Sequence, residues 1–144
     1  MLLALLAILC AGLFAGAAIY ITAVEHPARL ACGLTIAVKE FAPSYRRATV
    51  MQASLAGVGS VAGVVAWLYS GNGWLLTGAL LLGSVIPFTL LVILPTNKQL
   101  LDPALAAETS QAAVLLARWG RLHAVRSLVS AVAFVLLLLG LAGW

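Results

Sequence analysis

The sequence predicts an all-α integral membrane protein, a bundle of four transmembrane helices. Of its 144 residues, 64% are hydrophobic and 8% are charged, whereas a soluble domain carries roughly 25% charged residues. So few charged side chains cannot cover the surface of a water-soluble fold, which excludes that class. Intrinsic disorder is excluded as well, because disordered chains combine low hydrophobicity with high charge. All charged residues lie in two windows, 25–47 and 98–126. The rest of the chain divides into uncharged apolar segments.

Each apolar segment is long enough to cross a bilayer, which takes about 20 residues of helix. We expect a single membrane domain, residues 1–144, with spans at 2–24, 49–70, 74–95 and 123–144. The first segment lacks the positive start and the short apolar core of a cleavable signal peptide, so we expect a retained helix. Gly71-Asn72-Gly73 predicts a tight turn between the second and third spans.

The segment between the first two spans has the composition of a short helix lying at the membrane interface. Leu30 to Phe41 can form an amphipathic helix there, and we expect it to end before Pro43, because the residue preceding a proline avoids helical geometry. Pro43 suits the first turn of the second span. A span starting at Ser44 places Gln52 about 12 Å along the helix. The amide of Gln52 then lies below the membrane surface.

The positive charges predict how the chain is oriented. All eight Lys and Arg residues follow the first and third spans, and positively charged loops stay in the cytoplasm. We therefore expect cytoplasmic loops at 25–48 and 96–122 and both termini outside, in a bacterial inner membrane. The net charge of +4 then reflects orientation, with no nucleic acid as partner. The expected partners are the bilayer and an apolar small molecule, and a homo-oligomer remains open.

The fourth helix carries a cluster of candidate functional residues. Trp119, His123 and Arg126 are spaced i, i+4 and i+7, so they share one helix face. Ionisable groups near the hydrocarbon are costly unless they face the bundle interior or reach the interface. We therefore predict a function for His123 and Arg126. Simpler roles remain open: arginines set topology and bind lipid headgroups, and Trp119 suits an aromatic belt.

Polar residues of the other helices are expected to meet this cluster at the cytoplasmic end of the bundle. They are Glu25, His26, Arg29, Gln52 and Asn97. Glu25 and Arg29 are also spaced as an i, i+4 ion pair, provided that the helix continues through Pro27.

Four motifs follow one another in order along nearly the whole sequence. They are Glu25-His26-Pro27-Ala28-Arg29, Pro43-Ser44-Tyr45-Arg46-Arg47-Ala48, Pro95-Thr96-Asn97-Lys98, and Trp119, His123 and Arg126. In these motifs the chain resembles the anthrone oxygenase family, small four-helix integral membrane proteins. Some members of the family act on anthrones in polyketide pathways, which implies an oxygenase. The resemblance leaves the substrate of this chain open.

The candidate residues fit the chemistry that the resemblance implies. Oxidation of an anthrone by O₂ can begin by removal of a ring-methylene proton, and the resulting enolate reacts with O₂ without a cofactor. Such a site needs a base and a group that stabilises an oxyanion. We assign the base to His123 and the oxyanion to Arg126 or Arg29 with Asn97. Trp119, Arg29 and Gln52 are the expected substrate-binding residues, and an apolar substrate would arrive from the bilayer.

Two other classes of function remain open. Glu25, His26 and His123 supply the ligands of a non-haem iron site, and two histidines can also ligate haem or copper. Helix neighbours point about 100° apart, so Glu25 and His26 share a metal only if the helix ends at Pro27. A cofactor of either kind, or none, is compatible with the sequence. The second of these classes is a non-catalytic membrane subunit or a binder of an apolar ligand. A cavity beneath His123 and Arg126 would favour an enzyme or a binder, and solid packing there a structural role.

Overall fold

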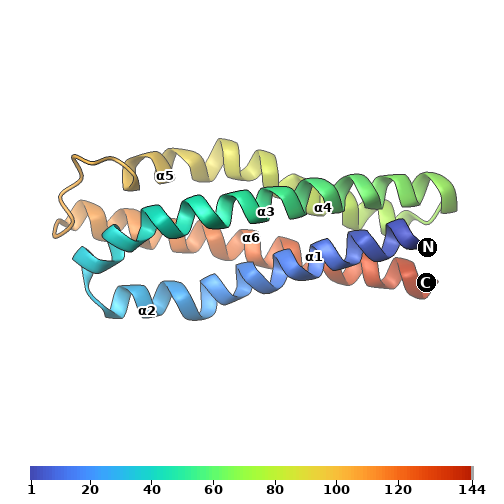
Figure 1. Ribbon diagram of the computed structural model, residues 1–144, viewed down its shortest axis with the longest axis horizontal. Coiled ribbons are helices and arrows are strands. Elements are labelled where there is room, and N and C mark those ends of the chain that lie inside the picture. The colour runs from blue at the N-terminus through green and yellow to red at the C-terminus, as the bar shows by residue number, and fades with distance from the viewer. Residues whose placement is uncertain (144) are drawn as a thin grey trace.

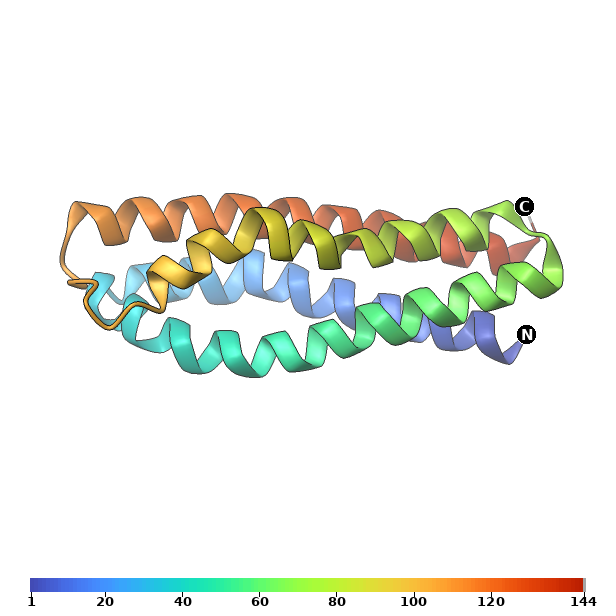
Figure 2. The ribbon, with the colours of Figure 1, turned by 90° about the horizontal axis from the view of Figure 1, so that it is seen from above.

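The computed structural model describes residues 1–143 and is an up-and-down bundle of four long helical rods (Figures 1 and 2). The first rod comprises α1 (Leu2–Tyr20), the π-helical turn η1 (Ile21–Glu25) and α2 (His26–Ala31). The second is α3 (Leu34–Ser70), and the third comprises α4 (Gly73–Phe88), the π-helical turn η2 (Thr89–Ile93) and α5 (Leu94–Leu100). The fourth is α6 (Ser110–Ala142). The predicted fold class is confirmed, and residues 1–143 contain no strand.

All four rods are long and apolar enough to cross a bilayer, as expected of a multi-pass membrane protein. They are also longer than the predicted spans. The second rod has 37 residues and is about 55 Å long at 1.5 Å per residue, against a hydrocarbon thickness of about 30 Å. The membrane helices therefore extend beyond their apolar stretches into the charged windows, and residues 101–109 of the second window form the connection between α5 and α6. Trp144, the last residue of the predicted fourth span, lies outside the described residues.

The predicted interfacial helix is wrong. The chain turns at Cys32 and Gly33, whose φ of +91° suits glycine, and α3 then continues without a break through Pro43. Ala37 and Phe41 are fully buried in an apolar cluster with residues of α6. This packing outweighs the lost hydrogen bond of an internal proline. Residues 34–41 are thus the first turns of the second rod.

Both π-helical turns lie immediately before a proline-containing helix start. Pro27 follows η1 and Pro95 follows η2, each at the second residue of the next α-helix. A proline has no backbone N–H and its ring crowds the carbonyl four residues earlier, and the wider π turn accommodates both. The two turns contribute Ile21, Glu25 and Ile93 to the walls of the cavity described below.

The rods pack as a square, in which the first and third each contact the second and the fourth. Close approach depends on glycine: a Cβ added at Gly59 would lie 2.8 Å from Cys10 Cβ, and one added at Gly63 would lie 2.7 Å from Ala79 Cβ. The N-terminus and the C-terminal end of α6 lie at the same end of the bundle as the turn between α3 and α4 (Figure 1). The α2–α3 and α5–α6 connections lie at the other end, which we call the charged end.

Two apolar clusters fill the bundle. One contains Phe14 and Leu137, and the other, toward the charged end, contains Phe41 and Trp119. Along α6 the buried and half-buried polar residues between the two clusters are His123, Arg126, Ser127 and Ser130. The core therefore contains a polar layer, and the candidate site lies in it.

Candidate functional site

A small cavity lies inside the bundle in this polar layer. Its volume is about 30 Å³, room for about two water molecules. Every predicted site residue except His26 lines it: Glu25, Arg29, Gln52, Asn97, Trp119, His123 and Arg126. The structure thus brings together residues from all four rods, as the sequence predicted, and the bundle is not packed solid at this point.

His123 is buried with one ring nitrogen paired. Its Nδ1 lies 3.0 Å from Thr22 Oγ1 on the first rod. Within residues 1–143 its side chain forms a hydrogen bond through Nδ1 and none through Nε2. His123 therefore has a free ring nitrogen beside the cavity.

Trp119 is buried at the centre of an aromatic cluster. The centroid of its indole lies 4.7 Å from the imidazole of His123, 5.1 Å from that of His26 and 5.3 Å from the ring of Phe41. The indole therefore lies in the interior and not at a lipid-facing belt. Because His123 stacks on it at an interplanar angle of 27°, the indole also fixes the plane of the imidazole.

Gln52 and Asn97 carry buried amides without partners. Gln52 is 2% exposed and Asn97 is 0% exposed, and neither the oxygen nor the nitrogen of either amide forms a hydrogen bond within the described chain. An unpaired buried polar group costs about 1–3 kcal/mol. Both side chains line the cavity, so their amides are available to a ligand or to water there.

Arg126 retains much of its capacity to bind an anion. Its Nη1 donates to Thr89 Oγ1 at 3.3 Å, and its guanidinium lies 5.3 Å from the centre of the Phe14 ring. Its Nε is buried without a partner. No carboxylate of residues 1–143 lies within salt-bridge distance of this guanidinium.

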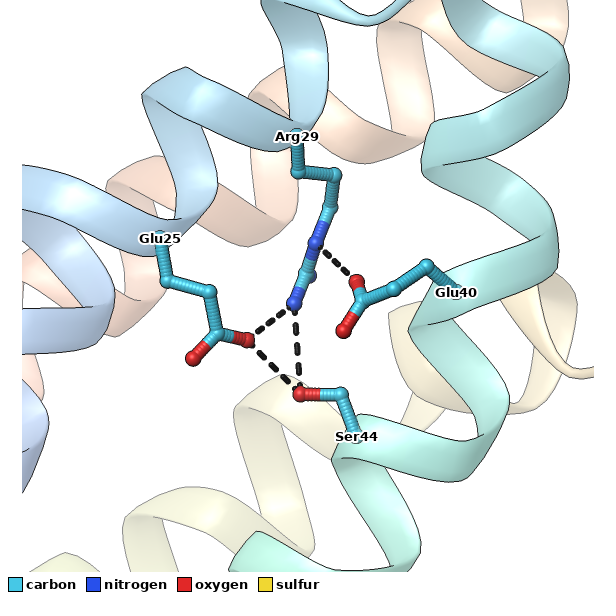
Figure 3. A network of polar contacts seen from close by, with 4 residues as sticks. All are labelled: Glu25, Arg29, Glu40 and Ser44. Carbon is cyan, nitrogen blue, oxygen red and sulfur yellow. Dashed lines mark hydrogen bonds and ion pairs between the residues drawn. The ribbon is translucent and has the colours of Figure 1, made fainter.

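Arg29, in contrast, is held by a network of polar side chains (Figure 3). Its Nη2 donates to Glu25 Oε1 and, at 3.3 Å, to Ser44 Oγ, and its Nε is ion-paired with Glu40. Ser44 in turn donates to Glu25 Oε1 at 2.7 Å. The predicted Glu25–Arg29 ion pair is present, because the helix continues through Pro27. With two carboxylates beside it, Arg29 is a weaker candidate than Arg126 for stabilising an oxyanion.

The three predicted metal ligands are not arranged as a metal site. Glu25 is engaged by Arg29 and Ser44, and His26 packs against Gly120, where an added Cβ would lie 2.6 Å from its Nε2. Since η1 passes directly into α2, Glu25 and His26 point in different directions. Among the residues that the structure describes, no group of three or more His, Cys, Asp and Glu side chains could hold a metal ion.

An apolar cleft of about 110 Å³ adjoins the polar cavity, between α3 and the third rod. Four residues line both spaces: Tyr45, Thr49, Gln52 and Arg126. Apart from Thr89, the other side chains that line the cleft are apolar, and among them Ala53 and Leu90 are exposed on the lipid-facing surface. It therefore connects that surface to the polar layer.

Several residues around the site were missed from the sequence. They are Phe14, Thr22, Phe41, Ser44, Tyr45, Thr89 and Ser127. A signal existed for Ser127, a polar residue one helical turn after His123 in an apolar segment. Thr22 has a similar signal, because it lies one turn before His26. The aromatic residues Phe14, Phe41 and Tyr45 had no comparable signal in the sequence.

Comparison with known proteins gives one match to a family. A family model described as anthrone oxygenase matches residues 41–136, about two thirds of the chain. The matched part includes Gln52, Asn97, Trp119, His123 and Arg126, whereas Glu25, His26 and Arg29 precede it. No curated protein and no solved structure matches the chain.

Proposed function

Because the chain belongs to the anthrone oxygenase family, we propose that it is a membrane oxygenase that oxidises a flat, apolar anthrone-type ketone with O₂. One observation carries the proposal. The unpaired amides of Gln52 and Asn97 and the carboxylate-free guanidinium of Arg126 surround a cavity beside His123, and an apolar cleft reaches that cavity from the lipid side. A purely structural bundle has no need of these unpaired groups.

The two adjoining spaces suggest how the substrate lies. A cavity of about 30 Å³ is too small for three fused rings, since it holds about two water molecules. We therefore place the outer rings in the apolar cleft and at its mouth, against the acyl chains, with the central ring at the junction of the two spaces. The methylene and the carbonyl lie on opposite edges of that ring, and each edge faces polar residues of the cavity. An apolar substrate dissolved in the bilayer reaches this position without crossing water.

The base in this proposal is His123. Its free Nε2 removes a proton from the ring methylene, and the negative charge moves onto the ring carbonyl oxygen. Arg126 and the amide of Asn97 donate hydrogen bonds to that oxygen, which lowers the barrier because the charge develops where the donors already point.

The remaining steps consume one O₂ per substrate. The electron-rich enolate reduces O₂, and a C–O bond forms at the former methylene carbon. The resulting peroxide anion takes back the proton held by His123 and becomes a hydroperoxide. Loss of the second hydrogen from that carbon, with cleavage of the O–O bond, releases water and leaves a second carbonyl. One oxygen atom therefore enters the quinone and the other leaves as water.

We also propose that the charged end faces the cytoplasm of a bacterial cell. The eight Lys and Arg residues lie in the windows at this end, and the positive-inside rule places such loops in the cytoplasm. The site then lies at the cytoplasmic side of the hydrocarbon layer.

Activity of the purified protein in liposomes tests the function. We expect a model anthrone to yield anthraquinone with equimolar O₂ uptake, faster than in empty liposomes, which report spontaneous oxidation. His123→Ala should lower the catalysed rate by about 10²–10⁴-fold, and Arg126→Ala by about 10²–10³-fold. Arg121→Ala, which removes an exposed arginine from the same helix, is the matched control and should retain activity. An unchanged rate in His123→Ala would remove the assigned base.

The cleft and cavity equally suit a second function, binding of an apolar aromatic ligand without turnover. Tight binding of the model anthrone without O₂ uptake would identify the protein as such a binder. In that case Arg126→Ala and Gln52→Met should weaken binding, whereas Arg121→Ala should not.

A further inference from the structure

We infer that Thr22 and Ser127 are positioning residues that hold the proton of His123 on Nδ1, so that Nε2 is the unprotonated, basic nitrogen. The catalytic consequence of this inference rests on the proposed function. The inference itself concerns which ring nitrogen carries the proton, and it can be measured without any substrate.

The observation is a chain of three short polar contacts leading away from the cavity. His123 Nδ1 lies 3.0 Å from Thr22 Oγ1, and Thr22 Oγ1 lies 2.8 Å from Ser127 Oγ. Ser127 Oγ then lies 2.9 Å from the backbone oxygen of Ala18. The chain links the first rod to α6 and ends on a carbonyl, which can only accept.

A count of protons decides which group donates in each of the three contacts. Three contacts need three protons, and each hydroxyl supplies one. If Ser127 donates to the carbonyl of Ala18 and Thr22 donates to Ser127, the contact between His123 and Thr22 needs a proton on Nδ1. With that proton in place, every contact in the chain is a hydrogen bond.

Every arrangement with a bare Nδ1 leaves oxygen atoms facing one another without a proton. If Thr22 donates to Nδ1 while Ser127 donates to Ala18, the contact of 2.8 Å between Thr22 Oγ1 and Ser127 Oγ has no hydrogen. The fully reversed direction fails at other contacts. In it Ser127 donates to Thr22, and Thr22 donates to a bare Nδ1. Ser127 Oγ would then lie 2.9 Å from the oxygen of Ala18 and 3.1 Å from that of His123, with no hydrogen in either contact. Unpaired acceptors in a low-dielectric interior are costly, so the forward direction is favoured.

Water in the cavity does not offer another solution. Neither Thr22 nor Ser127 lines the cavity, and Ser127 is 5% exposed. The two hydroxyl groups are therefore separate from the cavity. A neutral imidazole protonated on Nδ1 has its lone pair on Nε2, which makes Nε2 the acceptor that a general base requires.

Nuclear magnetic resonance of the ¹⁵N-histidine-labelled protein in detergent tests the inference, because ¹⁵N shifts distinguish protonated from bare ring nitrogens. The chain has two histidines, so His123→Gln identifies the signals of His123. We expect a protonated Nδ1 and a bare Nε2 in the unaltered protein. Thr22→Val, which removes the hydroxyl at nearly constant volume, should move much of the proton to Nε2, and Thr22→Ser should keep it on Nδ1.

Ser127→Ala provides a second test should Thr22→Val fail to fold. It removes the acceptor of Thr22, whose hydroxyl is then free to donate to His123, so the proton should again move to Nε2. A proton on Nε2 in the unaltered protein, or on Nδ1 in both Thr22→Val and Ser127→Ala, would overturn the inference.

Kinetics separate this inference from the proposed function. Thr22→Val should lower kcat by about tenfold or more, because the general-base contribution is weakened, with KM little changed, and Thr22→Ser should restore kcat. An unaltered protein with no oxygenase activity would refute the proposed function, while the ¹⁵N shifts would still decide the tautomer.

Discussion

The indole of Trp119 stacks on the imidazole of His123, with centroids 4.7 Å apart and planes inclined by 27°. Phe41 contacts the same indole edge-on, at an interplanar angle of 89°. Together with the bond from Nδ1 to Thr22, this stacking fixes both the plane and the rotation of the His123 ring. The free nitrogen of His123 is therefore held in one direction before any substrate arrives.

Removal of the stacked ring should therefore impair catalysis. Trp119→Leu frees the imidazole to tilt, and misplacement of a catalytic group by about 1 Å can lower a rate by about 10²-fold. We expect a loss of about 10- to 100-fold in kcat, whereas Trp119→Phe, which keeps an aromatic face, should retain most of the activity. Steady-state kinetics of the two variants checks this. Equal activity of Leu and Phe at this position would show that stacking is unimportant.

Gln52→Met should separate stability from activity. The change keeps the length of the side chain and removes two polar atoms that have no partner, each of which costs about 1–3 kcal/mol when buried. We expect the free energy of unfolding in detergent to stay constant or rise, while the rate of anthrone oxidation falls. Gln111→Met, at an exposed position on α6, is the matched control and should change neither. Clear destabilisation by Gln52→Met would indicate that the amide has a structural partner.

Access from the lipid should be blocked by Ala53→Trp. Ala53 lines the apolar cleft, so an indole at this position occupies the space proposed for the substrate rings. We expect a raised KM for a model anthrone with the thermal stability little changed. Val58→Trp is the control, because Val58 is 50% exposed on the same helix and does not line the cleft. Equal KM values in the two variants would argue against this route.

The orientation of the bundle can be tested with its two cysteines. Cys32 is exposed between α2 and α3, whereas Cys10 is buried. A membrane-impermeant maleimide should label Cys32 in inverted membrane vesicles and leave it unlabelled in intact spheroplasts, because the charged end is expected in the cytoplasm. Cys32→Ser should abolish the labelling. Labelling of Cys32 in intact spheroplasts would reverse the proposed topology.

The sequence was sufficient to predict four membrane helices and seven of the residues that line the cavity. Apolar stretches without charge identify membrane helices, since the lipid itself imposes this pattern. Likewise, polar residues near the ends of apolar spans tend to face the bundle interior. That reasoning correctly placed Gln52, Asn97 and His123 around one cavity.

The features that could not be predicted from the sequence depend on contacts between helices. The continuation of α3 through Pro43 follows from the burial of Ala37 and Phe41 against α6, which local preferences do not contain. The role of Thr22 is visible only once the first rod lies beside α6. The difference between the two arginines of the site also arises in this way, because Glu40 reaches Arg29 across the helix pair and leaves Arg126 without a carboxylate.

The most direct test of the account is a structure of the protein with bound anthraquinone, the stable product. The distance to measure is that between a ring oxygen of the product and the guanidinium of Arg126. We predict about 2.7–3.1 Å, the range for oxyanion donors, with the outer rings in the cleft beside Ala53 and the opposite edge of the central ring facing Nε2 of His123. A product bound instead in the open groove between α1 and α3, beside Tyr20 and Met51, would contradict the account.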